Sequence, residues 1–524
     1  MQEKLLEIAI NYKPAKMVAI PSFKLWSKSD TNVSAPTFVP DGFRYSIRIL
    51  CFLLLFGKET VNLMQKRIVE VFNNLKIRRK GIGEMNRKAL AIGIFSAVFF
   101  AAAGTAVYAQ TTMAKKTAPN EMDFGTEYYS ETVRVLDLMW DNRKDQIGKI
   151  SERAAATLRA GHKVVWDCTA GHSNISEVEP TLPCLPKGGM ITATEFSGQK
   201  TTIDALGKDD MLITNFINEQ TVAAHQRGVY VVGVTDSYFR HRSFSEQDNR
   251  DKKPNYQDLE LEDISSEVLI SEVPGQVGLV NMPYISEMKV GAGVGNFMIA
   301  LYWMVVSEVA DKMKNPDASS LQYAAQYHDT IMKRLDTIFR TQKSLLWSTA
   351  DELAVKVGNG GHMWVESWPK SVSNDASGAS MGLVFTNHYP KEKMKPGDVM
   401  FVCEVSDSTN SAMVQAARAA KAKGAYIVAI GPSNQTELKK LADVYFDNLS
   451  PEGYSLFRIK GHGNGIALAG SLINSIVYGA FSAQMVQEMN KRDWYPKYYM
   501  SYNWGGASGG YFEWLNWCVN RVGF

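Results

Sequence analysis

Five small polar residues stand close together in the C-terminal part of the sequence. They follow an apolar run at 399–403 and open a helical pattern at 411–423; they are Ser406, Ser408, Thr409, Asn410 and Ser411. Hydroxyl groups and free backbone N–H groups at the start of a helix can hold an anion. N-capping is the alternative, because Ser, Thr and Asn are preferred cap residues. A cap needs only one of them, so five within six positions favour ligand binding.

Two further polar pairs follow apolar runs elsewhere in the chain. They are Ser173 with Asn174, and Ser373 with Asn374. The carboxyl ends of parallel strands meet at one edge of a sheet, and ligands of such sheets bind there. We therefore expect these pairs at strand ends of the same kind as the one that carries residues 406–411.

Four residues could supply acid–base chemistry beside such a ligand: Glu177, Glu404, His172 and His462. A general acid or base must lie within hydrogen-bond reach of the ligand atom with which it exchanges a proton. Each residue has an alternative role, since a Glu in a first helical turn favours the helix dipole and a loop His is commonly a surface residue. Residues 110–524 contain no CxxC motif and no Cys/His cluster, so we expect no metal and no cofactor.

The chain from residue 127 onward repeats itself. Residues 160–174 align with 360–374 without a gap, and five positions are identical. Four further pairs of apolar runs follow in the same order: 189–196 with 382–388, 209–215 with 397–403, 227–235 with 423–431, and 265–271 with 442–448. Each run is short and bounded by Gly, Asp or Asn, which is typical of a buried strand.

Five apolar strands alternating with helices predict a parallel sheet covered on both faces. With right-handed crossovers, each half becomes a three-layer α/β/α sandwich around a five-stranded parallel sheet. Each half opens with a helical segment, about 127–159 and 323–357, and closes with another, about 293–314 and 463–490.

The closing segments are the candidates for a contact between the halves. Residues 297–309 are apolar nearly all round and residues 466–481 are similar, which indicates helices buried on more than one side. We expect a pseudo-twofold pair, as two identical domains form in a dimer, with the ligand site near the contact. The polar insertion at 240–263 is either a solvated loop or a flap over that site.

These motifs resemble those of the SIS (sugar isomerase) domain family. The run S-x-S-T-x-S at 406–411, followed by AAKAKGAYIVAIG, resembles the family's S-x-S-G-x-T motif with its helix and strand, although Thr409 stands where the motif has Gly. Residues 160–179 resemble the family's first strand and its Gly/Ser loop. The run ADVYFDNLSPEG at 442–453 resembles the last strand and turn of an exported subgroup. The resemblance covers about 127–314 and 323–490.

The resemblance implies a flavodoxin-like fold and a sugar or phosphosugar ligand. It implies that the phosphate is held by Ser406, Ser408, Thr409 and Ser411, with Ser173 and Ser373 in the adjoining loops. The implied roles are isomerase, partner of a transferase, or sensor.

The first half lacks the serine motif and offers only Thr214, Asn215 and Asn218 in its place. We expect a protein that binds a sugar derivative, with aldose–ketose isomerase activity as one form of that function. The alternative is a non-catalytic sugar-binding module in which the first half is a structural partner. A scaffold without a ligand is the third alternative.

Residues 85–109 have the order of a bacterial, Sec-type signal peptide. Arg87 and Lys88 precede an apolar run that ends in small residues before Gln110. The alternative is a membrane anchor, because the run approaches spanning length. We expect cleavage and a periplasmic or secreted protein, with residues 1–84 a non-native or disordered extension. Residues 491–524 form an aromatic C-terminal tail.

Composition and charge restrict the partners. The chain is 45% hydrophobic and 21% charged, as globular domains are. It carries 57 Lys and Arg against 54 Asp and Glu, but residues 110–524 carry 41 against 47. A nucleic-acid partner therefore has no electrostatic support, and a small molecule is the expected partner. The pseudo-dimer expected within the chain leaves a homo-oligomer open.

Mass spectrometry of the native protein tests the expected leader. We predict a mature N-terminus at Gln110 and no peptide from residues 1–80, because Met85 is the expected start. Any peptide from residues 1–80 would show that the start lies earlier. Retention of residues 85–109 would favour the membrane anchor.

Overall fold

The computed structural model describes most of the chain after residue 121. The described residues are 122–168, 192–193, 203–215, 217–236, 259–273, 278–282, 285–318, 320–377, 386–388, 393–459, 465–494 and 496. The chain divides into two units, 1–118 and 119–524, and every described residue belongs to the second. The predicted extension and signal peptide lie outside the described residues, as do most of the insertion at 240–263 and most of the C-terminal tail.

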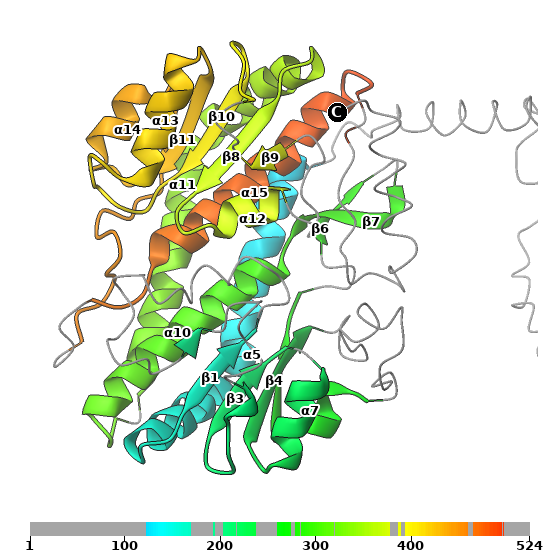
Figure 1. Cartoon of the computed structure of the whole chain (residues 1–524). Helices are drawn as coiled ribbons and strands as arrows, with labels where there is room; N and C mark the ends of the chain where they lie inside the picture. Colours follow the sequence, from blue (N-terminus) through cyan, green and yellow to red (C-terminus); the bar gives the residue numbers. More distant parts are fainter. Residues whose placement is uncertain are drawn as a thin grey trace, which may run out of the picture. The chain divides into compact units, whose positions relative to one another are not determined.

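The first half of this unit contains a parallel sheet with the strand order β2-β1-β3-β4-β5 (Figure 1). Its strands are β1 (Val164–Asp167), β2 (Thr192–Ala193), β3 (Met211–Thr214), β4 (Tyr230–Asp236) and β5 (Glu267–Ser271). Its helices are α5 (Phe124–Arg159), α7 (Glu219–Gln226), α9 (Leu261–Ile264) and α10 (Val294–Lys314).

The second half contains a parallel sheet with the corresponding order, β9-β8-β10-β11-β12. Its strands are β8 (Met363–Ser367), β9 (Thr386–His388), β10 (Val399–Cys403), β11 (Tyr426–Gly431) and β12 (Val444–Asp447). Its helices are α11 (Gln322–Gly358), α12 (Ser371–Ser377), α13 (Ala412–Ala422), α14 (Thr436–Leu441) and α15 (Ala469–Asn490). The fold is therefore α/β with parallel sheets, as the repeated apolar runs predict.

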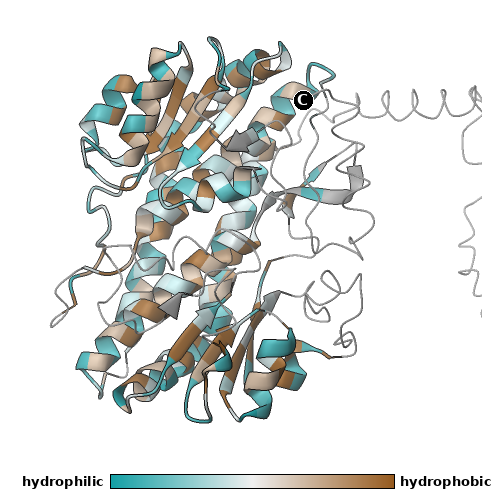
Figure 2. Cartoon of the chain, in the orientation of Figure 1, coloured by the Kyte–Doolittle hydropathy of each residue, from teal (hydrophilic) through white to brown (hydrophobic). Residues whose placement is uncertain are grey.

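Alternation of side chains along the strands produces the layers. In β10, Val399, Phe401 and Cys403 belong to the core shared with α11 and α15, whereas Met400 and Val402 belong to a cluster with α13 and α14. The first half follows the same pattern, with Trp166 on the side of α5 and α10, and Val165 on the side of α7. Figure 2 shows the strands of both sheets as largely hydrophobic, which fits sheets covered on both faces.

Four long helices join the two halves. Helix α15 packs on α11 of its own half and on α5 of the first half, and α10 packs on both α5 and α11. Every residue from Val294 to Lys312 of α10 is buried. The expected contact through the apolar helices is thus present, and one core runs through both halves. The pseudo-twofold relation itself stays a prediction.

At the amino edge of each sheet, one aspartate carboxylate accepts hydrogen bonds from two backbone N–H groups; we call this arrangement the carboxylate tie. Asp210, just before β3, accepts hydrogen bonds from the backbone N–H groups of Lys163 (2.7 Å) and Gly207 (2.8 Å). Asp398, just before β10, accepts from those of His362 (3.1 Å) and Lys395 (2.9 Å). Each carboxylate therefore fixes the entry of its own strand against that of the neighbouring strand.

The structure departs from the expectation in two places. An antiparallel hairpin, β6 (Gly278–Met282) with β7 (Ile285–Ala292), follows β5 and packs on α5 and α15. The closing helix of the second half begins at Ala469 rather than near residue 463. Across the residues described, no helix combines the length and the apolar character that a membrane span requires.

The close approach of α5 and α15 gives a stability prediction. A Cβ on Gly479 would lie 2.4 Å from both Cζ and the hydroxyl oxygen of Tyr128. Tyr128 is buried, and its hydroxyl accepts a hydrogen bond from Asn296 Nδ2 at 2.8 Å, so the ring has little room to move. We expect Gly479→Ala to lower the free energy of unfolding by about 1–3 kcal/mol.

Thermal and urea unfolding measure this effect. Gly207→Ala is the matched control, because among the described residues its Cβ would approach only Asp210 Oδ2, at 3.9 Å. Equal stability of the two variants would contradict the tight contact between α5 and α15.

Candidate functional site

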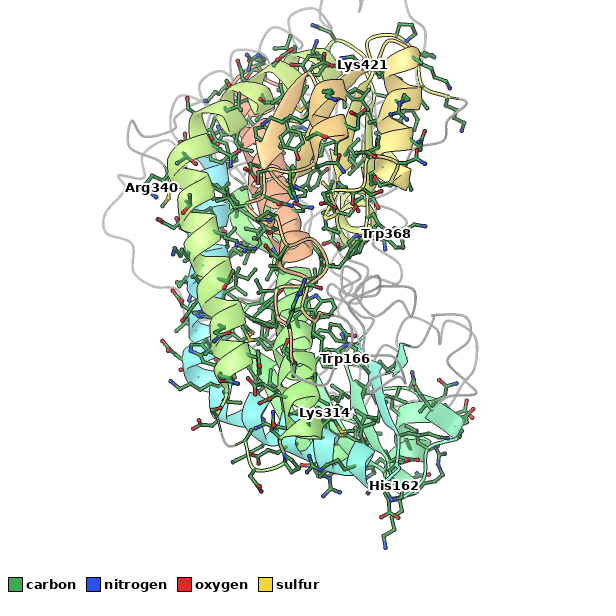
Figure 3. The ribbon with its side chains drawn as sticks, turned by 90° about the vertical axis from the view of Figure 1, so that its left-hand side faces the viewer. His162, Trp166, Lys314, Arg340, Trp368 and Lys421 are labelled. Carbon is green, nitrogen blue, oxygen red and sulfur yellow. The ribbon has the colours of Figure 1, made fainter. Side chains whose placement is uncertain are left out.

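The carboxyl edges of the two sheets face each other across the unit. Figure 3 shows His162, before β1, and Lys421, at the end of α13, at opposite extremes of the unit, with Trp166 and Trp368 lying between them. Trp166 is in β1 and Trp368 directly follows β8, so both mark the carboxyl side of their sheets. Residues that follow β8 and β10 therefore lie where parallel α/β sheets bind ligands.

A cavity of about 500 Å³ opens at the carboxyl end of β10. We call it the Glu404 cavity. It is lined by Trp368, Glu404, Ser406, Asp407, Ser408, Ser411, Ala412, Pro451, Glu452, Gly453 and Tyr454. It thus brings together four residues that the sequence predicts for the site, namely Glu404, Ser406, Ser408 and Ser411.

Glu404 is a fully buried carboxyl group at this edge. Its backbone N–H donates to Ile430 O at 2.9 Å, so the pairing of β10 with β11 extends to this residue. Its Oε1 accepts from the N–H groups of Val405 (2.8 Å) and Ser406 (2.9 Å) and from Ser406 Oγ (3.1 Å). Its Oε2 is buried and has no hydrogen-bond partner of normal geometry in the described part of the chain.

The environment of Glu404 shifts its proton equilibrium. Burial raises the pKa of this carboxyl above its ordinary value, because the charged form loses its hydration. The hydroxyl of Ser411 and the hydrogen bonds from Ser406 and Val405 lower the pKa, but they offset only part of the burial effect. Glu404 is therefore poised to exchange a proton at higher pH than an exposed glutamate.

The hydroxyl cluster divides into structural and free members. Ser411 is the N-cap of α13, and its Oγ accepts from Val414 N at 3.2 Å. Ser408 is exposed, and within the described residues its hydroxyl has no hydrogen-bond partner. Thr409 and Asn410 are also exposed but do not line the cavity. Capping therefore explains one residue of the cluster, and Ser408 is left available to a ligand.

The buried side chain of Gln435 holds the loop that carries these serines. Its Nε2 donates to the backbone oxygens of Ser406 and Ser408, both at 2.9 Å, while its Oε1 accepts from Leu438 N at 3.4 Å and caps α14. Sequence reasoning missed this residue. The signal in the sequence was that Gln435 lies among polar residues that follow the predicted strand at 423–431.

The loop after β12 forms the opposite wall of the cavity. Arg334 of α11 binds both carboxylate oxygens of Glu452, at 2.6 and 3.0 Å, and Ser450 Oγ at 3.0 Å. Glu452 and Tyr454 were not predicted as site residues, nor was Trp368. The turn at 447–453, part of the resemblance to SIS domains, was the signal for the first two.

Other predicted site residues lie elsewhere. Ser373 and Asn374 belong to α12 and do not line the cavity; the Ser373 hydroxyl donates to Lys370 O at 3.2 Å. At the matching strand end of the first half, Asn218 caps α7 by accepting from Gln220 N and Thr221 N. The remaining candidates lie outside the described residues: His172, Ser173, Asn174, Glu177 and His462.

No group of three or more His, Cys, Asp or Glu side chains suited to a metal ion occurs among the described residues. Cys168 and Cys403 are buried and form no disulfide, and burial raises the pKa of both thiols. Neither of these thiols is among the residues that line the Glu404 cavity, whereas three carboxyl groups are.

No family model matches the sequence, and no curated protein matches it as a relative. Solved structures with a similar course of the chain include the C-terminal domain of glucosamine-fructose-6-phosphate aminotransferase from Francisella tularensis (9% identity, TM-score 0.41), covering 71% of this chain and 98% of that one. A candidate phosphosugar isomerase from Silicibacter pomeroyi has 12% identity and TM-score 0.41, with coverages of 71% and 99%. A candidate tagatose-6-phosphate ketose/aldose isomerase from Clostridium novyi has 10% identity and TM-score 0.42, with coverages of 69% and 88%. The fold class stated above rests on the strand order and the layers.

The raised pKa of Glu404 predicts a pH-dependent difference in stability between wild type and Glu404→Gln. Below the unfolded pKa, near 4.5, the carboxyl is protonated in both states and contributes no pH dependence. As the pH rises from the unfolded to the folded pKa, the carboxyl ionises in the unfolded state while it stays protonated in the folded state. This ionisation stabilises the unfolded state, so the free energy of unfolding of wild type falls relative to that of the variant. Above the folded pKa the difference is constant.

Urea unfolding of both proteins from about pH 4 to pH 9 measures this difference. Because the other titrating groups are common to the two proteins, their effects cancel. A difference that grows as the pH falls would mean that the folded pKa is lowered instead.

Proposed function

We propose that the second half of the chain binds a sugar or a sugar derivative in the Glu404 cavity. The observation that carries this proposal is the buried carboxyl oxygen Oε2 of Glu404, which lacks a hydrogen-bond partner of normal geometry in the described chain. An unsatisfied buried polar atom costs free energy, and a ligand hydroxyl that donates to it would recover that cost.

The other lining groups suit the same ligand. Ser408 offers a free hydroxyl, and within the described residues the backbone N–H groups of Ala412 and Met413 have no acceptor, as expected at a helix start. Trp368 adds a partly buried aromatic surface for the apolar face of a sugar ring. A few polar groups that converge on a partly apolar cavity are the usual form of a small-molecule site. The resemblance of the sequence to SIS domains supports the same ligand class.

A second candidate function is aldose–ketose isomerisation at this site. It is favoured by Glu404, because a raised pKa makes this buried carboxylate a stronger base than an exposed glutamate for moving a proton between C1 and C2. NMR of aldose and ketose panels distinguishes the two functions. Conversion that falls at least a hundredfold in Glu404→Gln supports isomerisation. Ligand-induced shifts without conversion support a binding module whose first half is a structural partner.

We also propose that the protein acts outside the cytoplasm, as a tandem of SIS-like domains at about 127–314 and 323–490. The sequence at 85–109 supports export through its basic start, apolar run and small residues. The equal strand order of the two sheets supports the tandem.

Ser408→Ala tests the binding site. Removing one hydrogen bond to a sugar costs about 1 kcal/mol, so we expect affinity to fall about fivefold, with the fold unchanged because Ser408 is exposed. Calorimetry with a sugar that binds the wild type measures the change. Thr409→Ala is the matched control, since this neighbouring hydroxyl does not line the cavity. Equal affinities of the two variants would place the ligand elsewhere.

A further inference from the structure

The carboxylate of Glu404 accepts hydrogen bonds from part of the donor set that the serine loop would offer a phosphate. The donors that a serine-rich loop offers an anion are its hydroxyls and backbone N–H groups. Here the N–H groups of Val405 and Ser406 and the Ser406 hydroxyl already donate to Glu404 Oε1. A phosphate would therefore find three donors of the loop already used by an internal anion, which leaves it the Ser408 hydroxyl and the N–H groups of Ala412 and Met413.

The charges around the cavity also disfavour the binding of a phosphate. Among the described residues that line the cavity, three carry carboxyl groups, namely Glu404, Asp407 and Glu452, and none is Lys, Arg or His. Arg334 is the cation behind this wall, but both of its terminal nitrogens bind the Glu452 carboxylate. The guanidinium charge is thus balanced before a ligand arrives.

The start of α13 does not reverse this balance. A helix N-terminus contributes about half a positive charge, and that effect extends only over the first turn. Ser411, at this terminus, is also the hydroxyl that stabilises the Glu404 carboxylate. A phosphate dianion placed here would add two negative charges beside three carboxyl groups, at most one half of a charge being compensated by the helix.

We infer that the Glu404 cavity takes an unphosphorylated sugar and that Glu404 and Glu452 exclude the phosphorylated form. This inference rests on the proposed sugar binding and narrows its ligand class. The recognised chemistry is a hydrogen-bond donor on the sugar, either a hydroxyl or an ammonium group, that points at Glu404 Oε2. An ammonium group would in addition gain from the acidic lining.

Calorimetry on the full chain tests the exclusion. The probes are glucose, fructose and glucosamine, each with its 6-phosphate. We expect wild type to bind at least one unphosphorylated sugar at least about tenfold more tightly than its 6-phosphate. Glucosamine binding more tightly than glucose identifies the donor as an ammonium group, and equal binding identifies it as a hydroxyl.

Two isosteric variants then show where the exclusion comes from. Glu404→Gln removes the internal anion, and Glu452→Gln frees the guanidinium of Arg334, so each should reduce the preference by about tenfold or more. Glu452 lies at the partly exposed rim, so its variant carries the test if Glu404→Gln fails to fold. Glu437→Gln is the charge-matched control on α14, away from the lining, and should leave the preference unchanged.

The outcomes separate the inference from the proposal beneath it. Tighter binding of a 6-phosphate by wild type would overturn the inference and leave sugar binding intact. An unchanged preference in both cavity variants would also overturn it. Binding of none of the six probes would contradict both the sugar-binding proposal and the inference that depends on it.

Discussion

One apolar core, shared by α5, α10, α11 and α15, holds both sheets in place. Because α15 packs on a helix from each half, neither half can bury its apolar surface without the other. The same helices reach the Glu404 cavity. Asn474 of α15 donates to the backbone oxygen of Glu404 at 3.1 Å, and Arg334 of α11 holds the wall at Glu452. The packing between halves therefore also sets the geometry of the site in the second half.

The site itself is a place where the fold accepts a local cost. Burying a carboxyl group is unfavourable unless its oxygens are satisfied, and in the described structure only Oε1 of Glu404 is fully hydrogen-bonded. An apolar residue at this position would remove that cost, but among the described lining residues it would also remove the only buried carboxyl group. Functional sites commonly contain such residues, whose local effect is to lower stability.

Sequence reasoning predicted the strands because their signal is local. Runs such as 399–403 and 426–431 are apolar throughout, which is what a sheet covered on both faces requires. The hairpin β6–β7 was missed because Asn281, Glu287 and Lys289 interrupt its apolar residues. The serine cluster was placed correctly at the start of a helix. Glu404 accepts hydrogen bonds from this cluster because of its side-chain conformation, which no local sequence pattern predicts. Arg334 and Glu452 are 118 positions apart, so no local pattern predicts their contact either.

The carboxylate tie at the amino edge of each sheet has a consequence for how such a molecule can change. Asp210 and Asp398 make equivalent hydrogen bonds in the two halves. The turns at the opposite edges differ, because Asn218 caps a helix in the first half and a serine loop surrounds Glu404 in the second. If the halves descend from one duplicated gene, the determinants of folding and of recognition have been inherited separately, at opposite ends of the same strands. One half could then lose or gain a ligand specificity by mutation while the other half continued to support the shared apolar core.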